Sequence, residues 1–390
     1  MTAPRPLRIA VVGDLDSIHT LRWLRAFAAR GHEMHAVSFY RPRGDVPAGV
    51  TLHVLREGAA GSRDASRTVQ GLRRFVPAWL IRPLHGARYL RAGLRQTLRH
   101  IAPDIVHAHF VVEYGFYSAL AGLKPLVVSA WGSDVYLAPR NPLTNLIARW
   151  TLRHAALVTG SDPAMLSALR RLGVSDERVH LVRIGALEEG FFDPQPVSVN
   201  TGGAGTPPTV ISTRALEPLY NVETVLRAFS RARKHVPGAH LLMAHEGSQR
   251  AALGALAVEL DLGDSVSFLG RLTPEQMRDA LSMAQVYVSV PSSDSMPAST
   301  MEAMARGCFP VVSDLPSQDG FIEHGVTGLR VTAGDVPTLA LALQRALVDA
   351  TLRHGAVAAN RATVEAEGRL SDQVVRLEEA LRPLLSDTHP

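Results

Sequence analysis

Short apolar runs alternate with longer segments of helical periodicity along almost the whole chain, and this alternation limits the possible folds more than any other feature. In the first half, strand-length runs cover residues 7–13, 32–39, 50–56, 105–109, 126–131 and 157–160. Between them, Leu21, Leu24 and Phe27 show a helical spacing. Runs that are apolar throughout fit strands buried on both faces, and their alternation with helices predicts parallel sheets built from βαβ units.

The same pattern restarts after a segment rich in proline and glycine. Residues 193–208 contain four prolines and three glycines, a composition typical of a linker. Further strand-length runs follow at 209–213, 241–244, 266–270, 286–290 and 310–313. The sequence therefore predicts an α/β protein with a first domain at 1–192, a linker at 193–208, a second domain at 209–350 and a helical tail at 351–390.

Two doubly wound domains joined by a linker are expected to face each other across a cleft. In open parallel sheets, ligands bind beyond the carboxyl ends of the strands. We therefore expect the site at the facing edges of the two domains, although this argument predicts a location and no chemistry.

The composition excludes several classes of site. The 390 residues include a single cysteine, Cys308, which excludes an intramolecular disulfide framework and any multi-cysteine zinc or iron–sulfur centre. The first apolar run, residues 9–13, is too short for a signal peptide, and no stretch reaches the length of a membrane span. These features predict a cytoplasmic protein.

One segment has an unusual charge pattern. Residues 65–103 contain no Asp or Glu, yet eight arginines lie between Arg67 and Arg99, with Phe75 and Trp79 among them. One interpretation is a solvated helical face. The interpretation we favour is docking on an anionic membrane surface, which would place the protein peripherally on the inner face of the plasma membrane. No motif of a nucleic-acid-binding fold accompanies the arginines, so nucleic acid is not expected as a partner.

The segment from 291 to 312 carries the clearest chemical pattern. A strand is expected to end at Pro291, and a small polar loop containing Asp294 follows. A helix is expected to begin near Ser299, an N-cap candidate, with Glu302 three residues later in capping-box spacing. The backbone N–H groups at that helix start would attract an anion. The alternative is that Glu302 is only a cap and Asp294 only a turn residue.

This segment resembles the signature of the family-4 retaining glycosyltransferases of GT-B architecture. That signature has two carboxylates separated by seven residues, followed by Glu-Ala-Met-Ala-x-Gly-x-Pro-Val-Val. Here Asp294 replaces the usual first Glu, and one extra residue precedes Pro310. Further segments resemble landmarks of the family in the same order, namely 13–19, 104–109, 129–135, 213–214, 245–247 and 268–270.

The resemblance implies a GT-B fold, in which two Rossmann-like doubly wound domains face a central cleft and the tail crosses back to the first domain. It implies that Glu302 holds the ribose of a nucleotide sugar, and that His109, Arg214 and Asp294 act at the reacting centre. The donor-binding residues that it implies are Gly13, Arg214, Tyr220, Asn221, Glu246, Gly270, Arg271, Ser295, Met296, Ser299, Thr300 and Glu302. A UDP-sugar is favoured over a GDP-sugar as co-substrate, and neither a metal nor a further cofactor is expected.

On the acceptor side, the resemblance implies roles for His19, Trp131 and Asp134. His107 and His109 share one face of a strand, so both could reach the cleft or both could be buried. The resemblance favours His109 as the residue beside the transferred sugar. Asp134 could instead be a turn cap, and Trp131 could instead be a core aromatic.

The chain departs from the family in the loop after the first strand of the second domain. A lysine usually follows the arginine there, and the pair clamps the diphosphate, whereas this loop has Arg214 and no lysine. Arg214 can still bind phosphate as a fork. Tyr220 or Asn221 could add a neutral hydrogen bond, and Arg271 could supply the second charge. An unusual donor or lost activity is the remaining alternative.

The resemblance implies the transfer of a sugar, of hexosyl or N-acetylhexosaminyl type, from a nucleotide diphosphate to an acceptor hydroxyl with retention. The acceptor would be a glycan, a lipid-linked or a small molecule, in the synthesis of envelope polysaccharide, glycolipid or glycoconjugate. A silent sugar-nucleotide-binding protein and a transferase for a soluble acceptor are the alternatives. A phosphorylase of this fold would need a pyridoxal-binding lysine. This alternative is disfavoured, because the only lysines are Lys124 and Lys234, and neither is placed at a strand end over the cleft.

Overall fold

The computed structural model describes residues 5–55, 93–193 and 207–386. The chain forms two compact units, Met1–Ile184 with Ser371–Pro390, and Gly185–Leu370. Most of the arginine-rich stretch lies outside the described residues. The described part includes Arg95 and Arg99, which are exposed.

Unit 1 is built on a parallel sheet of seven strands in the order β3-β2-β1-β4-β5-β6-β7. The strands are β1 (Arg8–Val12), β2 (Glu33–Ser38), β3 (Val50–Val54), β4 (Ile105–His109), β5 (Leu126–Ser129), β6 (Leu157–Gly160) and β7 (Val179–Leu181). The strand order reverses between β1 and β4, where Val12 lies opposite Ala108. This reversal is a topological switch point, the place where doubly wound sheets bind ligands.

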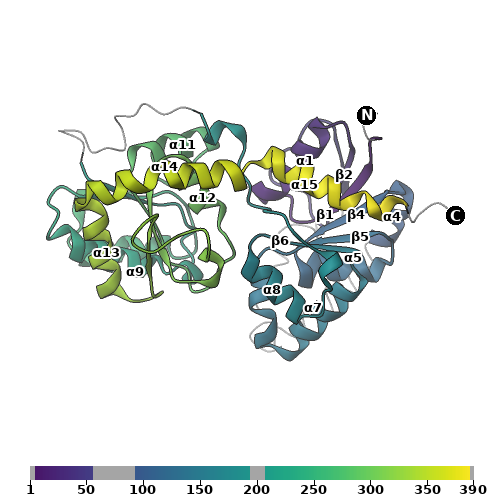
Figure 1. Cartoon of the computed structure of the whole chain (residues 1–390), viewed down its shortest axis with the longest axis horizontal. Helices are drawn as coiled ribbons and strands as arrows, with labels where there is room; N and C mark the ends of the chain where they lie inside the picture. Colours follow the sequence, from purple (N-terminus) through teal and green to yellow (C-terminus); the bar gives the residue numbers. More distant parts are fainter. Residues whose placement is uncertain (1–4, 56–92, 194–206, 387–390) are drawn as a thin grey trace. The chain divides into compact units, whose positions relative to one another are not determined.

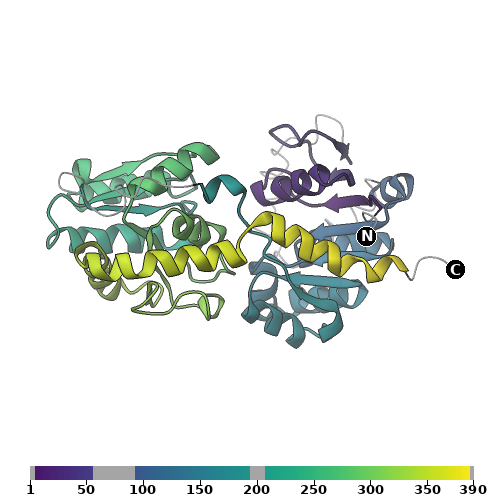
Figure 2. The same cartoon turned by 45° about the horizontal axis from the view of Figure 1, so that its top comes forward.

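Helices cover the sheet of unit 1. They include α1 (Ile18–Ala29), α4 (Leu94–Ile101), α5 (Phe116–Ala121), α6 (Ser133–Tyr136), α7 (Pro142–His154), α8 (Pro163–Arg171) and α15 (Leu370–Leu381). The apolar sides of α4, α5, α7 and α8 pack with one face of the strands into a single core. Figures 1 and 2 both show α15 beside α1, where Glu378 binds Arg30 and His32.

Unit 2 repeats this plan with six parallel strands in the order β10-β9-β8-β11-β12-β13. The strands are β8 (Thr209–Ser212), β9 (His240–Met243), β10 (Val266–Phe268), β11 (Val286–Ser289), β12 (Phe309–Ser313) and β13 (Leu329–Val331). The helices are α9 (Val222–Arg233), α10 (Arg250–Glu259), α11 (Pro274–Met283), α12 (Ala298–Ala305), α13 (Val336–Val348) and α14 (Ala350–Glu367). The switch point here lies between β8 and β11.

Each face of the unit 2 sheet has its own core, because alternate side chains of a strand point to opposite faces. Along β11, Val286 and Val288 pack with α9, α10 and α13. Tyr287 packs on the opposite side with α11 and α12. All four residues of β11 are buried, as expected of a strand covered on both faces.

The predicted fold class is confirmed: both units are Rossmann-like parallel sheets. The short strands β7 and β13 were not predicted. Each has three residues and lies at a sheet edge, too short for an apolar run to stand out. Within the described ranges, no helix combines the length and apolarity needed to cross a membrane.

Candidate active site

The loops that follow β8 and β11 bring the second-unit candidates together at the switch point. Arg214 comes two residues after β8, and Asp294 lies in the loop between β11 and α12. The Arg214 guanidinium donates from Nη2 to Asp294 Oδ2 at 2.6 Å and from Nη1 to Ser299 Oγ at 2.9 Å. Its Cζ lies 4.1 Å from the centre of the Tyr220 ring, in cation–π geometry.

Arg214 is nearly inaccessible to solvent, with 11% of its side chain exposed. Desolvation is the largest single effect and opposes its charge, but the Asp294 carboxylate together with Tyr287 and Tyr220 outweighs it and leaves the pKa of Arg214 raised above its usual value. The guanidinium is therefore a fixed cation held against one carboxylate.

Several buried polar atoms around this cluster have no protein partner among the described residues. They are Arg214 Nε, Thr213 Oγ1, Ser289 Oγ and Thr300 Oγ1. Thr213 and Ser289 stand at the carboxyl ends of β8 and β11, and Thr300 lies in the first turn of α12. Leaving such a group unpaired costs about 1–3 kcal/mol. Their concentration at one switch point is typical of a site that a polar ligand completes.

The start of α12 differs from the sequence expectation. The helix begins at Ala298 with Pro297 as its N-cap and has no side-chain cap, so Ser299 is not the N-cap. The Ser299 hydroxyl is instead engaged by Arg214 and by the Tyr287 hydroxyl, which donates to it at 2.8 Å. Glu302 consequently lies beyond the first turn and forms no capping box.

The other residues of this loop and helix differ in exposure. Glu302 is 9% exposed, Ser295 6% and Met296 3%. Met296 packs into the core shared by α11 and α12. The donor-binding roles of these three residues stay predictions.

Asn221 connects the two loops of the unit 2 switch point. Its Nδ2 donates to the carbonyl of Val290 and to Ser292 Oγ, both at 2.9 Å. Its φ of 50° lies in the left-handed region, which asparagine tolerates better than most residues. Because both amide hydrogens are used within the protein, the geometry gives Asn221 a positioning role.

Glu246, Gly270 and Arg271 follow the ends of β9 and β10. Gly270 has φ 71°, and a Cβ there would lie 3.2 Å from Glu246 Oε1. Arg271 is exposed, and its side chain has no hydrogen bond or ion pair with the described residues.

In unit 1, His109 ends β4 at the switch point and is fully buried. Its Nδ1 lies 3.1 Å from Thr20 Oγ1 of α1, and its Nε2 is buried with no partner among the described residues. A Cβ on Gly13 would lie 3.3 Å from His109 Cβ, so the glycine after β1 leaves room for the histidine.

Burial disfavours the charged form of both histidines of β4. Burial lowers the pKa of His107 to about 4. Burial, and then the charges of His107 and His19, hold the pKa of His109 well below its usual value. The next residue, Phe110, has φ 81°, an uncommon backbone conformation for a bulky residue. Such conformations cluster at functional sites.

Asp134 is buried and binds the loops after β4 and β5. Its carboxylate accepts hydrogen bonds from the backbone N–H groups of Val111 at 2.7 Å, Trp131 at 3.0 Å and Gly132 at 2.8 Å. Burial raises the pKa of Asp134, and these hydrogen bonds oppose the rise. Asp134 therefore shapes the loop that carries Trp131, whose ring packs edge-on against His19 with centroids 5.8 Å apart.

Three residues at these sites were not predicted. Thr20 contacts His109, Tyr287 contacts Ser299, and Gly185 lies against the start of α12, where a Cβ would come within 3.1 Å of Ala298 Cβ. In the sequence, Thr20 stands next to His19 and Tyr287 lies inside an apolar strand. Neither position alone indicates a residue of the site. No group of three or more His, Cys, Asp or Glu side chains able to hold a metal occurs within the described ranges.

Two family profiles match consecutive parts of the chain. The family described as "Glycosyl transferase 4-like" matches residues 8–162, and "Glycosyl transferases group 1" matches residues 198–363. The first match covers the unit 1 switch point, and the second covers that of unit 2.

Two curated relatives illustrate the range of similar proteins. The chain is 34% identical over 173 residues to an exopolysaccharide phosphotransferase of Streptomyces coelicolor, across 43% of this chain and 17% of the relative. It is 22% identical over 244 residues to N-acetyl-alpha-D-glucosaminyl L-malate synthase of Bacillus anthracis, across 61% of this chain and 63% of the relative. The chain thus spans less than two thirds of the length of either relative.

The fold matches solved structures over nearly its full length. Anabaena HepE, crystallised with UDP and glucose, superimposes with a TM-score of 0.74 at 16% identity, covering 97% of this chain and 100% of HepE. At this identity the likeness shows the fold alone. Together with the two family matches, the two Rossmann-like units show that the chain belongs to the family-4 glycosyltransferases of GT-B architecture.

Proposed function

We propose that this chain transfers a hexosyl or N-acetylhexosaminyl group from a nucleotide-diphosphate sugar to an acceptor hydroxyl, with retention of the anomeric configuration. The observation that carries the proposal is the Arg214 cluster. It combines a buried cation, an ion pair to Asp294 and unpartnered polar atoms at the switch point of unit 2.

The diphosphate of the donor is proposed to bind at Arg214 and the start of α12. Arg214 uses one N–H on Asp294 and one on Ser299, and its Nε, which has no partner among the described residues, is proposed to donate to a phosphate oxygen. The first backbone N–H groups of α12 add favourable dipoles for an anion. In this proposal Arg271, which has no partner in the described part of the chain, supplies the charge of the missing lysine.

The proposed reaction needs no dedicated base. The bond between the anomeric carbon and the phosphate oxygen breaks while the acceptor oxygen forms a bond to the same carbon on the same face. The acceptor proton passes to the departing diphosphate. Arg214 stabilises the negative charge that develops on the leaving group, the kind of effect that contributes most in many enzymes.

Unit 1 is proposed to position the transferred sugar and the acceptor. His109 is neutral and has one ring nitrogen without a protein partner, so it can form a hydrogen bond to a sugar hydroxyl without adding charge. His19 and Trp131 would contact the acceptor, and Asp134 would fix the Trp131 loop.

UDP is the nucleotide that we propose, because HepE was crystallised with UDP. For the acceptor we propose a glycan or glycolipid of the cell envelope. The S. coelicolor relative is named for an exopolysaccharide, which supports this choice. The B. anthracis relative is named for L-malate, which favours a soluble small acceptor as the second candidate.

A membrane-surface acceptor is proposed from the arginine-rich stretch, whose acid-free sequence would attract anionic lipid by about 1 kcal/mol per arginine. The test is co-sedimentation with anionic and neutral vesicles, using wild type and an Arg73→Glu/Arg74→Glu/Arg82→Glu variant. We expect binding of the wild type to anionic vesicles only, weakening as salt rises. Equal partitioning of both proteins would contradict this proposal.

The function itself is tested by donor hydrolysis with a panel of UDP- and GDP-sugars, measured as release of the free nucleotide diphosphate. We expect turnover of at least one UDP-sugar by wild type, and turnover about 1000-fold slower by Arg214→Ala. Binding of a nucleotide sugar without turnover would favour the alternative of a silent sugar-nucleotide-binding protein, which the missing lysine suggests.

A further inference from the structure

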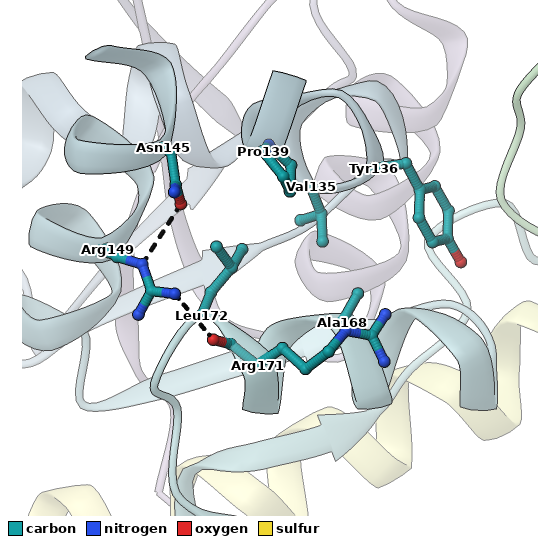
Figure 3. A pocket seen from close by; sticks show the side chains of 8 residues that line it. All are labelled: Val135, Tyr136, Pro139, Asn145, Arg149, Ala168, Arg171 and Leu172. Atoms are coloured by element: carbon teal, nitrogen blue, oxygen red, sulfur yellow. Dashed lines mark hydrogen bonds between the residues drawn. The ribbon is translucent and has the colours of Figure 1, made fainter. Parts of the chain in front are cut away.

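A pocket of about 260 Å³ opens in unit 1 among α6, the short helix η3 (Ala138–Arg140), α7 and α8. Its lining comprises Val135, Tyr136, Pro139, Asn145, Arg149, Ala168, Arg171 and Leu172 (Figure 3). The lining has two arginines and no carboxylate. None of these residues belongs to the active site proposed above.

The floor of the pocket is apolar. Val135, Ala168 and Leu172 are each less than 10% exposed and belong to the core of the unit. The Tyr136 ring forms a wall, and its hydroxyl donates to Asp162 Oδ1 at 2.9 Å. Asp162 is buried and also caps α8 by accepting from the Met165 N–H, so its carboxylate does not face the pocket as an exposed charge.

The two arginines differ in how they are held. Arg149 donates from Nε to Asn145 Oδ1 at 3.3 Å and from Nη2 to the Arg171 carbonyl at 3.1 Å. These contacts fix its guanidinium and satisfy a carbonyl at the end of α8, which would otherwise repel an anion. The Arg171 side chain has no partner among the described residues, and in Figure 3 it extends along α8 toward Ala168.

We propose that this pocket binds a small amphipathic anion, a phosphate monoester or carboxylate with a short apolar arm. The Arg171 guanidinium binds the anionic head, and Val135, Ala168 and Leu172 receive the apolar arm. Arg149, held on the opposite side of the pocket, adds positive potential. Apolar floors with a few placed polar groups are typical of small-molecule sites, and guanidinium groups suit phosphate and carboxylate.

The test uses hexyl phosphate and inorganic phosphate as probes on the full chain, with binding measured by ligand-observed NMR. Hexyl phosphate should bind ~10-fold more tightly than inorganic phosphate, because buried methylene groups add affinity. Arg171→Gln should weaken the binding of hexyl phosphate ~10-fold, because the charge-assisted contact is lost. Arg153→Gln is the matched control, because Arg153 is an exposed arginine in the last turn of α7, as Arg171 is in that of α8. It should change binding less than ~2-fold.

Two further variants keep the test independent of folding and of the donor site. Ala168→Leu fills the floor and should abolish hexyl phosphate binding with an unchanged circular dichroism spectrum. Arg214→Ala should leave the binding intact. Equal affinity for the two probes, equal effects of Arg171→Gln and Arg153→Gln, or loss of binding in Arg214→Ala would overturn the proposal.

Discussion

At the scale of single residues, the guanidinium of Arg214 makes three different contacts. It bears an ion pair to Asp294, a hydrogen bond to Ser299 and the Tyr220 ring beneath its plane. A lysine can keep the charge but cannot reproduce the planar fork or the stacking. Substitution by lysine can therefore separate what the shape of the guanidinium contributes to donor turnover from what its charge contributes.

Arg214→Lys is expected to lower kcat/KM for donor turnover by about 100-fold, and Arg214→Ala by about 1000-fold, because a preorganised donor to the leaving group is lost. Steady-state release of the nucleotide diphosphate measures both effects. Arg227→Lys, at a partly exposed arginine paired with Glu223 on α9, serves as the control and should behave as wild type. Full activity of Arg214→Lys would show that a point charge is sufficient.

Glu302 tests the ribose contact. Glu302→Gln keeps the size of the side chain but removes its charge, and we expect donor binding to weaken by about 2 kcal/mol. Calorimetric titration with a nucleotide sugar measures the change, and Glu259→Gln, on an exposed position of α10, is the control. Unchanged affinity would mean that Glu302 does not hold the donor.

At the scale of elements, one carboxylate of α15, that of Glu378, makes several contacts with the rest of unit 1. Glu378 accepts from Arg30 Nε at 2.5 Å and Nη2 at 2.7 Å, and its Oε1 lies 2.9 Å from His32 Nε2. The other ring nitrogen of His32 accepts from the Leu7 N–H at 3.0 Å. One carboxylate thus links the helix α15 to the end of α1 and the start of β1.

The Glu378 link should make unit 1 sensitive to acid. Desolvation is the largest single effect and raises the pKa of Glu378, but the hydrogen bonds and the charges of Arg30 and His32 together outweigh it and leave the pKa lowered. A carboxyl with a lowered folded pKa stabilises the native state above its unfolded pKa, and this stability is lost as pH falls through the folded pKa.

We therefore expect Glu378→Gln to lower the free energy of unfolding by about 1–2 kcal/mol at pH 7. The lower values reflect the partial exposure of Arg30. The cost should shrink toward pH 3. Urea unfolding followed by tryptophan fluorescence at several pH values measures it. A cost that does not depend on pH would show that the carboxylate charge contributes nothing.

The elements were more predictable from the sequence than their contacts. The run Val286–Ser289 is apolar on both faces, so its burial in a parallel sheet followed directly. That β1 lies next to β4, by contrast, depends on contacts between residues about a hundred positions apart. The N-cap of α12 was misplaced by two residues, at Ser299 instead of Pro297, because Ser299 is engaged by Arg214 and Tyr287, a tertiary contact that overrides local capping preference.

At the scale of the whole molecule, two natural probes are divided between the units. All four tryptophans lie within residues 1–184, and the single cysteine, Cys308, lies in unit 2. Cys308 is 1% exposed, and its thiol donates to the Leu281 carbonyl at 3.1 Å. Burial raises its pKa to about 12, so the folded thiol is neutral and unreactive.

Because the units have separate cores, they need not unfold in one step. Tryptophan fluorescence reports unfolding of unit 1, and reaction of Cys308 with a thiol reagent reports that of unit 2. Both can be followed in one urea series below about pH 8.5, above which ionisation of the unfolded thiol favours unfolding of unit 2.

This division tests which unit holds the donor. If the nucleotide sugar binds at Arg214 and α12, it should protect Cys308 by about 2.7 kcal/mol at a ligand concentration of 100 times Kd, by mass action. The tryptophan transition should shift less, because unit 1 would contribute only contacts to the sugar. In Arg214→Ala, the nucleotide sugar should no longer protect Cys308. The urea midpoint of Cys308 exposure in this variant without ligand is the reference for that comparison. A nucleotide sugar that shifts the tryptophan transition alone would place the main donor contacts on unit 1, and with them the charge that the leaving group requires.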